Sequence, residues 1–134
     1  MVVLYQHDIT GASLEELYNN LRQESGHAAD GFTRDEVGGV LADLAEVDAA
    51  IDGASRGWPA HRLAALERSI LRLGVYEIKR RDDIPAEVSI DEAVSLAKRF
   101  CSREAAALVN GVLGNVAAGR DNRDGADPAP QAKD

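Results

Sequence analysis

The sequence predicts an all-helical protein, and three observations support this fold class. Apolar residues make up 45% of the 134 residues but aromatic residues only 4%, and a chain rich in alanine and leucine favours helices over strands. Segments of the S/T-x-x-E type, which cap the first turn of a helix, begin at Ser13, Thr33 and Ser89. Apolar residues recur at helical spacing after each of them. A chain of this length is expected to form one compact domain.

The helix predicted to organise this domain spans residues 61–78. Two apolar stripes at helical spacing cover most of its circumference. They are formed by Leu63, Leu66, Ile70 and Leu73, and by Leu71, Val75 and Ile78. A helix that is apolar on most sides is buried, so this one is expected at the centre of the fold. Its charged strip, with Glu67 and Arg72 near each other's reach, is either a solvated edge or a contact surface.

The part of the chain before this helix is predicted to contain three further helices. Residues 1–7 have helical character without a preceding cap, and residues 8–11 indicate a stop and a turn. The capping segment at Ser13 opens a second helix. After a loop, Thr33 opens a third, longer helix that reaches Ile51 as one element.

Residues 52–59 are predicted to link this acidic part of the chain to the central helix. Trp58 is expected to fill the joint between two helical layers. Pro59 fits the first turn of the central helix, because the N–H groups of that turn form no hydrogen bond within the helix and a proline there loses none. At the other end, Ile84 stands before Pro85 and is driven to an extended conformation, so the central helix has ended there.

Two more helices are predicted after the proline. Ser89 opens the first, with Phe100 expected on its inward face, and Ser102 is the expected N-cap of the last helix. Within that last helix, Gly111 is expected to permit the close approach of a neighbouring helix.

The folded domain is predicted over residues 1–118, and the polar stretch 119–134, rich in Gly, Asp, Pro and Ala, is predicted to be a disordered tail. The net charge of −8 is unevenly distributed. Residues 1–60 carry three basic and eleven acidic side chains, whereas residues 61–120 carry ten basic and eight acidic ones. An acidic chain is a poor general binder of phosphate backbones, so any contact with nucleic acid must come from a local patch.

Several classes of function find no support in the residues. Cys101 is the only cysteine, which fits a reducing cytoplasm and a structural role. No apolar stretch reaches the roughly 18 residues of a membrane span, and no export signal is present at the start. The histidines at positions 7, 27 and 61 are scattered, so no metal site is expected. Without a glycine-rich loop or a convergent catalytic set, no cofactor is expected and a binding module is favoured over an enzyme.

Several spaced motifs in the second half resemble the NusB family of bacterial transcription antitermination factors. These motifs are ILRLGVYE at residues 70–77, DIPAEVSIDEAVSLAK at residues 83–98 and VNGVL at residues 109–113. Further upstream, LYQ at residues 4–6 and DI at residues 8–9 are similar to the end of that family's first helix.

The resemblance implies an all-helical fold of about seven helices in two antiparallel subdomains. It also implies a non-enzymatic factor that binds the boxA RNA of ribosomal RNA transcripts. Its partner would be the ribosomal protein NusE, and the pair would join the antitermination complex on RNA polymerase. Some relatives form homodimers, so pairing of two copies is also a possibility that the resemblance raises.

Candidate site residues follow from the same resemblance. Those on the RNA side are Tyr5, Gln6, Glu104, Leu108 and Asn110, and those on the partner side are Glu67 and Arg72. Asn110 lies in the V-N-G motif, where packing is an equally good explanation.

This chain departs from the family pattern in two ways. Leu108 stands where relatives often carry an aromatic ring, so apolar contact replaces base stacking there. The family's arginine-rich start does not precede Met1. We therefore expect the genomic sequence upstream to encode a basic stretch in frame.

Two other functions compete with an RNA-binding antitermination factor. One is an adaptor that binds only proteins, through the acidic first half and the charged strip of the central helix. The other is an accessory module of ribosomal RNA cytosine methylation, because the same module forms the first part of some ribosomal RNA methyltransferases. Binding of boxA RNA with and without NusE separates the three hypotheses.

Overall fold

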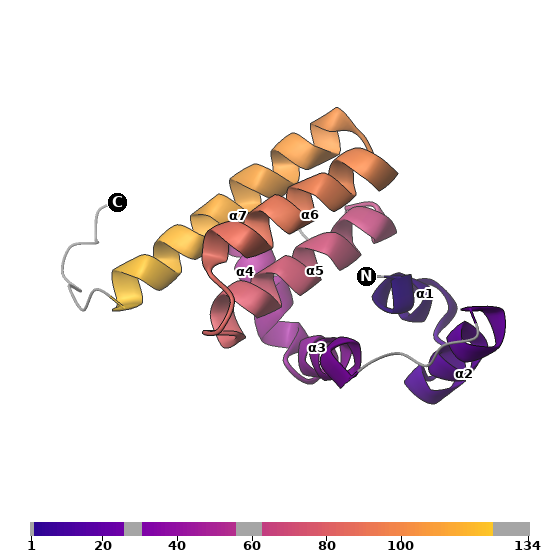
Figure 1. The fold of residues 1–134 in the computed structure, drawn as a ribbon. Coiled ribbons are helices and arrows are strands. Elements are labelled where there is room, and N and C mark those ends of the chain that lie inside the picture. The colour runs from indigo at the N-terminus through magenta and orange to yellow at the C-terminus, as the bar shows by residue number, and fades with distance from the viewer. Residues whose placement is uncertain (1, 26–30, 56–62, 125–134) are drawn as a thin grey trace.

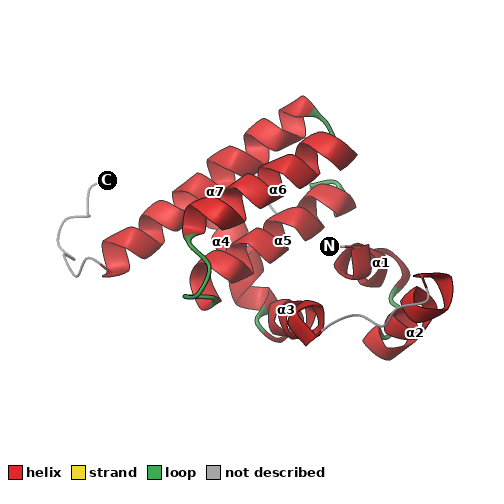
Figure 2. Cartoon of the chain, viewed as in Figure 1, coloured by secondary structure: helices red, strands yellow, loops and turns green. Residues whose placement is uncertain are grey.

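A computed structural model describes residues 2–25, 31–55 and 63–124 of the chain (Figure 1). Over these residues the chain forms seven α-helices and no strand, as predicted (Figure 2). The helices are α1 (Val2–Thr10), α2 (Leu14–Ser25), α3 (Gly31–Ala42), α4 (Leu44–Ala54), α5 (Ala65–Arg80), α6 (Ala86–Phe100) and α7 (Arg103–Asp124).

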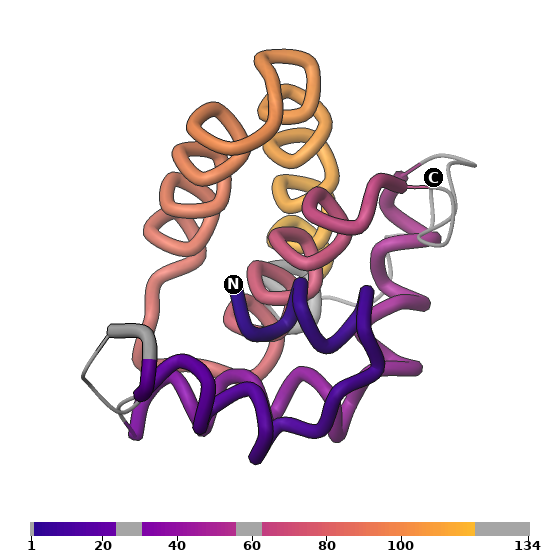
Figure 3. The backbone as a smooth tube through the Cα atoms, turned by 90° about the vertical axis from the view of Figure 1, so that its right-hand side faces the viewer, coloured from indigo at the N-terminus to yellow at the C-terminus, as the bar shows by residue number. Residues whose placement is uncertain are grey.

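Two apolar clusters divide the fold into two helical subdomains. The larger lies among α4, α5, α6 and α7, and the smaller lies among α1, α2 and α3 at one end of the molecule (Figures 1 and 3). The central position predicted for α5 is confirmed, since α5 packs against α1, α3, α4, α6 and α7. Most of its apolar residues lie in the larger cluster, while Leu73 and Tyr76 pack against the smaller one. The predicted positions of Trp58 and Pro59 lie outside the described residues.

Two glycines allow helices to pack closely against side chains. A Cβ added at Gly74 would lie 2.7 Å from Cδ1 of Leu113, so α5 and α7 meet closely at this point. Gly39 of α3 likewise lies under the ring of Tyr76. The close approach expected at Gly111 is wrong, because nothing would lie within 4 Å of a Cβ there.

Two of the four predicted helix caps form as expected. The Ser13 hydroxyl accepts a hydrogen bond from the Glu16 N–H at 3.1 Å, and the Ser102 hydroxyl accepts one from the Ala105 N–H at 2.9 Å. The caps predicted at the other two sites are wrong, since Thr33 lies inside α3 and Ser89 lies inside α6. Pro85 is the actual N-cap of α6, with φ −60° and ψ 142°, and a proline ring fixes a φ compatible with that role.

The long helix predicted up to Ile51 is two helices. It breaks at Asp43, whose φ of −107° and ψ of 22° depart from helical values. The Asp43 carboxylate accepts a hydrogen bond from Arg80 of α5 at 2.8 Å. The break lets α3 and α4 run in different directions, so α3 faces the smaller cluster and α4 faces the larger one (Figure 1).

Three other helix features differ from the sequence prediction. Helix α1 continues past Asp8 to Thr10 and ends at Gly11, whose φ of +72° suits glycine. Phe100, expected to point inward, is 47% exposed. Helix α7 extends to Asp124, beyond the predicted domain end at residue 118, and the predicted disorder of the tail stays a prediction.

Candidate nucleic-acid and protein interface

The charged strip of α5 is occupied by aspartates from two other helices. Arg72 donates to Asp48 of α4 through Nε and Nη2, both at 2.8 Å, and lies 3.5 Å from Asp8 of α1. Arg68 donates to the same Asp8 through Nε at 3.2 Å and Nη2 at 2.5 Å. We call this set of four residues the α1–α4–α5 joint. The pairing between Glu67 and Arg72 considered from the sequence is wrong.

Burial and charge act in opposite directions on Arg72, whose side chain is only 12% exposed. Burial disfavours its charged form, but the hydrogen bonds and the charge of Asp48 outweigh burial and raise the pKa of Arg72 above its usual value. A bidentate pair of this kind is stronger and more directional than an ordinary hydrogen bond. The joint therefore connects α1 and α4 to α5, and Arg72 is charged under all ordinary conditions.

No sequence pattern predicts the two aspartates of this joint. Asp8 and Asp48 are separated from their arginines by 24 to 64 residues, far beyond the three- or four-residue spacing of pairs on one helix. Asp8 lies in a predicted turn and in a matching motif, and neither indicates an arginine partner. The role of Arg72 in binding a protein partner stays a prediction. To contact a partner, Arg72 would have to break its ion pairs with Asp48 and Asp8 or form a further contact beside them.

Glu67, the other residue predicted on the partner side, is half-buried. Burial raises the pKa of the Cys101 thiol, and the negative charge of Glu67 raises it further, so the two side chains lie near each other. Glu67 therefore lies beside the end of α6.

The candidates on the last helix fall on two neighbouring faces. Glu104 is exposed and Leu108 half-buried, and they lie one turn apart on the same face of α7. Leu108 lines a pocket of about 240 Å³ between α4 and α7 with Ala54, whose carbonyl accepts a hydrogen bond from Asn115 at 3.1 Å. Asn110 lines a different groove, between α7 and α6. The structure thus brings Glu104 and Leu108 together but not Asn110.

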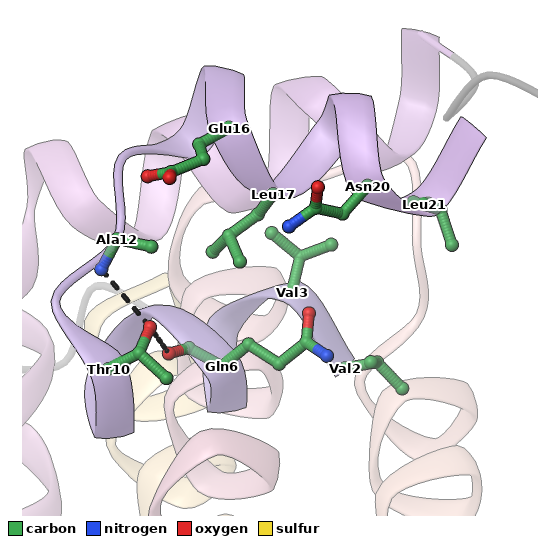
Figure 4. A pocket seen from close by; sticks show the side chains of 9 residues that line it. All are labelled: Val2, Val3, Gln6, Thr10, Ala12, Glu16, Leu17, Asn20 and Leu21. Carbon is green, nitrogen blue, oxygen red and sulfur yellow. Dashed lines mark hydrogen bonds between the residues drawn. The ribbon is translucent and has the colours of Figure 1, made fainter. Parts of the chain in front are cut away.

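The candidates on the first helix also diverge. Gln6 is exposed and lines a pocket of about 290 Å³ between α1 and α2. Figure 4 shows the Gln6 side chain along α1 and the Asn20 side chain projecting from α2. The carbonyl of Gln6 accepts a hydrogen bond from the Thr10 hydroxyl at 2.7 Å. Tyr5 is half-buried and does not line this pocket.

Within the described ranges, no group of three or more His, Cys, Asp and Glu side chains could hold a metal ion. In the same part of the chain, no helix is both long enough and apolar enough to cross a membrane. The candidate residues lie on exposed or half-buried helix faces rather than around one cavity. The fold and these surfaces are those of a small all-helical binding protein, whose candidate binding residues lie on its outer faces.

The sequence model of the NusB family matches residues 1–118, and the chain belongs to this family. It is 43% identical over 111 residues to the transcription antitermination protein NusB of Rubrobacter xylanophilus, covering 83% of this chain and 79% of that one. Its fold is similar to a solved structure of T. maritima NusB, with 31% identity and a TM-score of 0.75 over 87% of this chain and 83% of that one.

A second solved structure contains antitermination factors NusB and NusE in complex with dsRNA. One of its chains is 26% identical to this chain, with a TM-score of 0.74, and the match covers 87% of this chain and 89% of that chain.

Proposed function

We propose that this chain is a transcription antitermination factor that binds boxA RNA of ribosomal RNA transcripts together with NusE. The observation that carries the proposal is the likeness, over most of both chains, to a chain in the solved complex of NusB, NusE and dsRNA. Family membership supports the same function. The pair would join the antitermination complex on RNA polymerase and act on nascent RNA in the cytoplasm.

The geometry supports binding rather than catalysis as the mode of action. Glu104 and Leu108 share one face of α7 at the turn into that helix, where the family resemblance expects RNA contact. Leu108 offers an apolar surface to a base without the stacking of an aromatic ring. Glu67 lies near this turn, beside Cys101, so a protein bound at Glu67 would lie next to RNA bound at Glu104.

A titration of labelled boxA RNA with and without NusE tests the proposal. We expect weak binding by the chain alone, tight binding with NusE, and an affinity that falls steeply as the salt concentration rises. A scrambled RNA of the same length is the control for sequence recognition. Absence of RNA binding in the presence of NusE would contradict the proposal.

The competing function is an adaptor that binds proteins only. The acidic character of residues 1–60, with three basic and eleven acidic side chains, favours it. In the same titration, an adaptor would bind NusE and leave the RNA free.

A further inference from the structure

A groove of about 640 Å³ runs between α6 and α7. The two helices are antiparallel and lie side by side, so the end of α6 faces the start of α7 (Figure 1). Lys98 from the last turn of α6 and Arg103 from the first turn of α7 line one end of this groove. Asp91 and Asn110 line it about two helical turns further along. We call this surface the α6–α7 groove.

Within residues 2–25, 31–55 and 63–124, the two cations of the groove lack a charged partner. In the part of the chain that the structure describes, Lys98 and Arg103 form no ion pair, and both residues are exposed. The arginines along α5 and at its end each have a carboxylate partner. These are Arg68, Arg72, Arg80 and Arg81. Exposed cations without a partner that flank a groove attract an anionic ligand and hold it without breaking an internal contact.

We infer that the α6–α7 groove binds a single-stranded segment of the RNA, with Lys98 and Arg103 contacting phosphates and Asn110 contacting a base. This inference rests on the proposed function and extends the RNA surface to two cations that the family resemblance did not single out. It also explains the position of Asn110, which lies on a different face of α7 from Leu108.

The chemistry of each end of the groove suits a different part of a nucleotide. A guanidinium donates in a fork that matches two phosphate oxygens, and an ammonium adds a second positive charge beside it. The amide of Asn110 can both donate to and accept from a base edge. The carboxylate of Asp91 accepts only, so it suits a base amino group and repels phosphate. The groove therefore orients a strand with its backbone toward the turn between the helices.

The groove is continuous with the face that carries Glu104 and Leu108. Arg103 and Glu104 are adjacent at the start of α7, about 100° apart around the helix. A strand that lies over Leu108 could thus pass across the start of α7 and enter the groove. This continuity favours RNA over an acidic peptide as the occupant.

The test is the salt dependence of boxA RNA binding, in the presence of NusE, by the double variant Lys98→Gln/Arg103→Gln. Each single-strand phosphate contact contributes about 0.7 to the slope of log affinity against log salt. Loss of two contacts should make the slope shallower by about 1.4 and lower the affinity roughly 25-fold at about 0.1 M salt. Asn110→Ala should leave the slope unchanged and reduce the preference for boxA over a scrambled RNA several-fold.

A matched control is Arg22→Gln/Lys79→Gln, which removes the same charge from α2 and α5 and should change the affinity far less. If the wild type binds RNA and the groove variant keeps the wild-type slope, the inference is wrong while the proposed function stands. If the variant instead loses NusE, the groove is a protein contact and the inference is again wrong. A wild type that binds no RNA with NusE would overturn both.

Discussion

The α1–α4–α5 joint and the α6–α7 groove contain the same kinds of charged side chain in opposite situations. In the joint, Arg72 is held by Asp48 and Asp8, and its side chain is 12% exposed. In the groove, Lys98 and Arg103 are exposed and have no ion pair within the described ranges. The difference shows that the position of a cation on a helix says little about its role. Its partners decide whether it stabilises the fold or remains available to a ligand.

Replacing Arg72 by glutamine should have the largest effect on stability. The change leaves Asp48 with no guanidinium in a partly buried site, and we expect the free energy of unfolding to fall by about 2 kcal/mol. Urea unfolding followed by circular dichroism measures it. The effects of Arg72→Gln and Asp48→Asn should be less than additive in the double variant. Arg80→Gln is the control, since that exposed arginine also pairs with carboxylates, and its effect should be much smaller. Full additivity would show that the joint does not act as a unit.

The same variants separate the two possible roles of Arg72. If Arg72 contacts NusE directly, Arg72→Gln should weaken NusE binding more than Asp48→Asn does, although both variants break the same ion pair. Equal losses of NusE affinity would mean that Arg72 acts only through the fold. Glu67→Gln, which breaks no ion pair among the described residues, tests the other residue predicted on the partner side.

A methyl group added at Gly74 of α5 faces the packed side of α7, whereas one added at Gly111 lies on the open side of α7. The two should change stability in opposite directions. Gly74→Ala would place a Cβ 2.7 Å from Leu113 Cδ1 at the end of a side chain in the core, so the free energy of unfolding should fall by about 1–2 kcal/mol. Gly111→Ala meets nothing within 4 Å and should raise stability by up to about 1 kcal/mol, because alanine favours a helix interior. Thermal unfolding of both variants checks this prediction, and a neutral Gly74→Ala would show that α5 and α7 are less tightly packed.

A buried carboxyl group near Arg81 should make stability depend on pH. Burial, followed by a hydrogen bond and charge repulsion from Glu77, raises the pKa of Glu36 from its ordinary value of 4.5 to about 8. The folded chain therefore binds a proton that the unfolded chain releases near pH 4.5. The resulting stabilisation is fully present below that pH and is lost as the pH rises through about 8.

We expect the free energy of unfolding to be lower at pH 9 than at pH 6, by about 1 kcal/mol or more. Glu36→Gln, which mimics the protonated acid, should flatten this dependence. Asp35→Asn changes an exposed carboxylate next to it and should leave the dependence in place. A pH dependence that is the same in wild type and Glu36→Gln would assign it to other groups.

The smallest effect on stability is expected at the α6–α7 groove. Since Lys98 and Arg103 have no ion pair within residues 2–25, 31–55 and 63–124, Lys98→Gln/Arg103→Gln should change the free energy of unfolding by less than about 0.5 kcal/mol. The same urea titration as for Arg72→Gln gives the comparison. A large loss of stability would mean that the groove cations hold the fold together, as those of the joint do.

Local features of the fold could be predicted from the sequence because their causes are local. Ser13 and Ser102 cap helices through bonds to residues three positions away, and the apolar stripes of α5 place it at the centre. At the start of α6, Pro85 and Ser89 are both local signals for a helix start, and the start predicted at Ser89 was wrong. Pro85 initiates α6 before Ser89 can, because its ring fixes φ and its carbonyl accepts from Val88 at 3.0 Å.

The charged contacts could not be predicted because they join residues far apart in the chain. The break at Asp43 involves Arg80, and the joint involves Asp8 and Arg68. The same limit applies to the α6–α7 groove, which exists only because Lys98 and Arg103 lie on two antiparallel helices. The family motifs predicted candidate positions for binding, but they carry no information on which cations lack an ion pair among the described residues.

A nuclear magnetic resonance titration tests this division between the two sets of cations most directly. The chain would be labelled with ¹⁵N, bound to NusE and titrated with boxA RNA. We expect large shifts of the Arg103 and Asn110 signals, with the side-chain Nε–H signals of Arg68 and Arg72 nearly unchanged. Shifts at Arg68 and Arg72 with none at Arg103 would contradict the account.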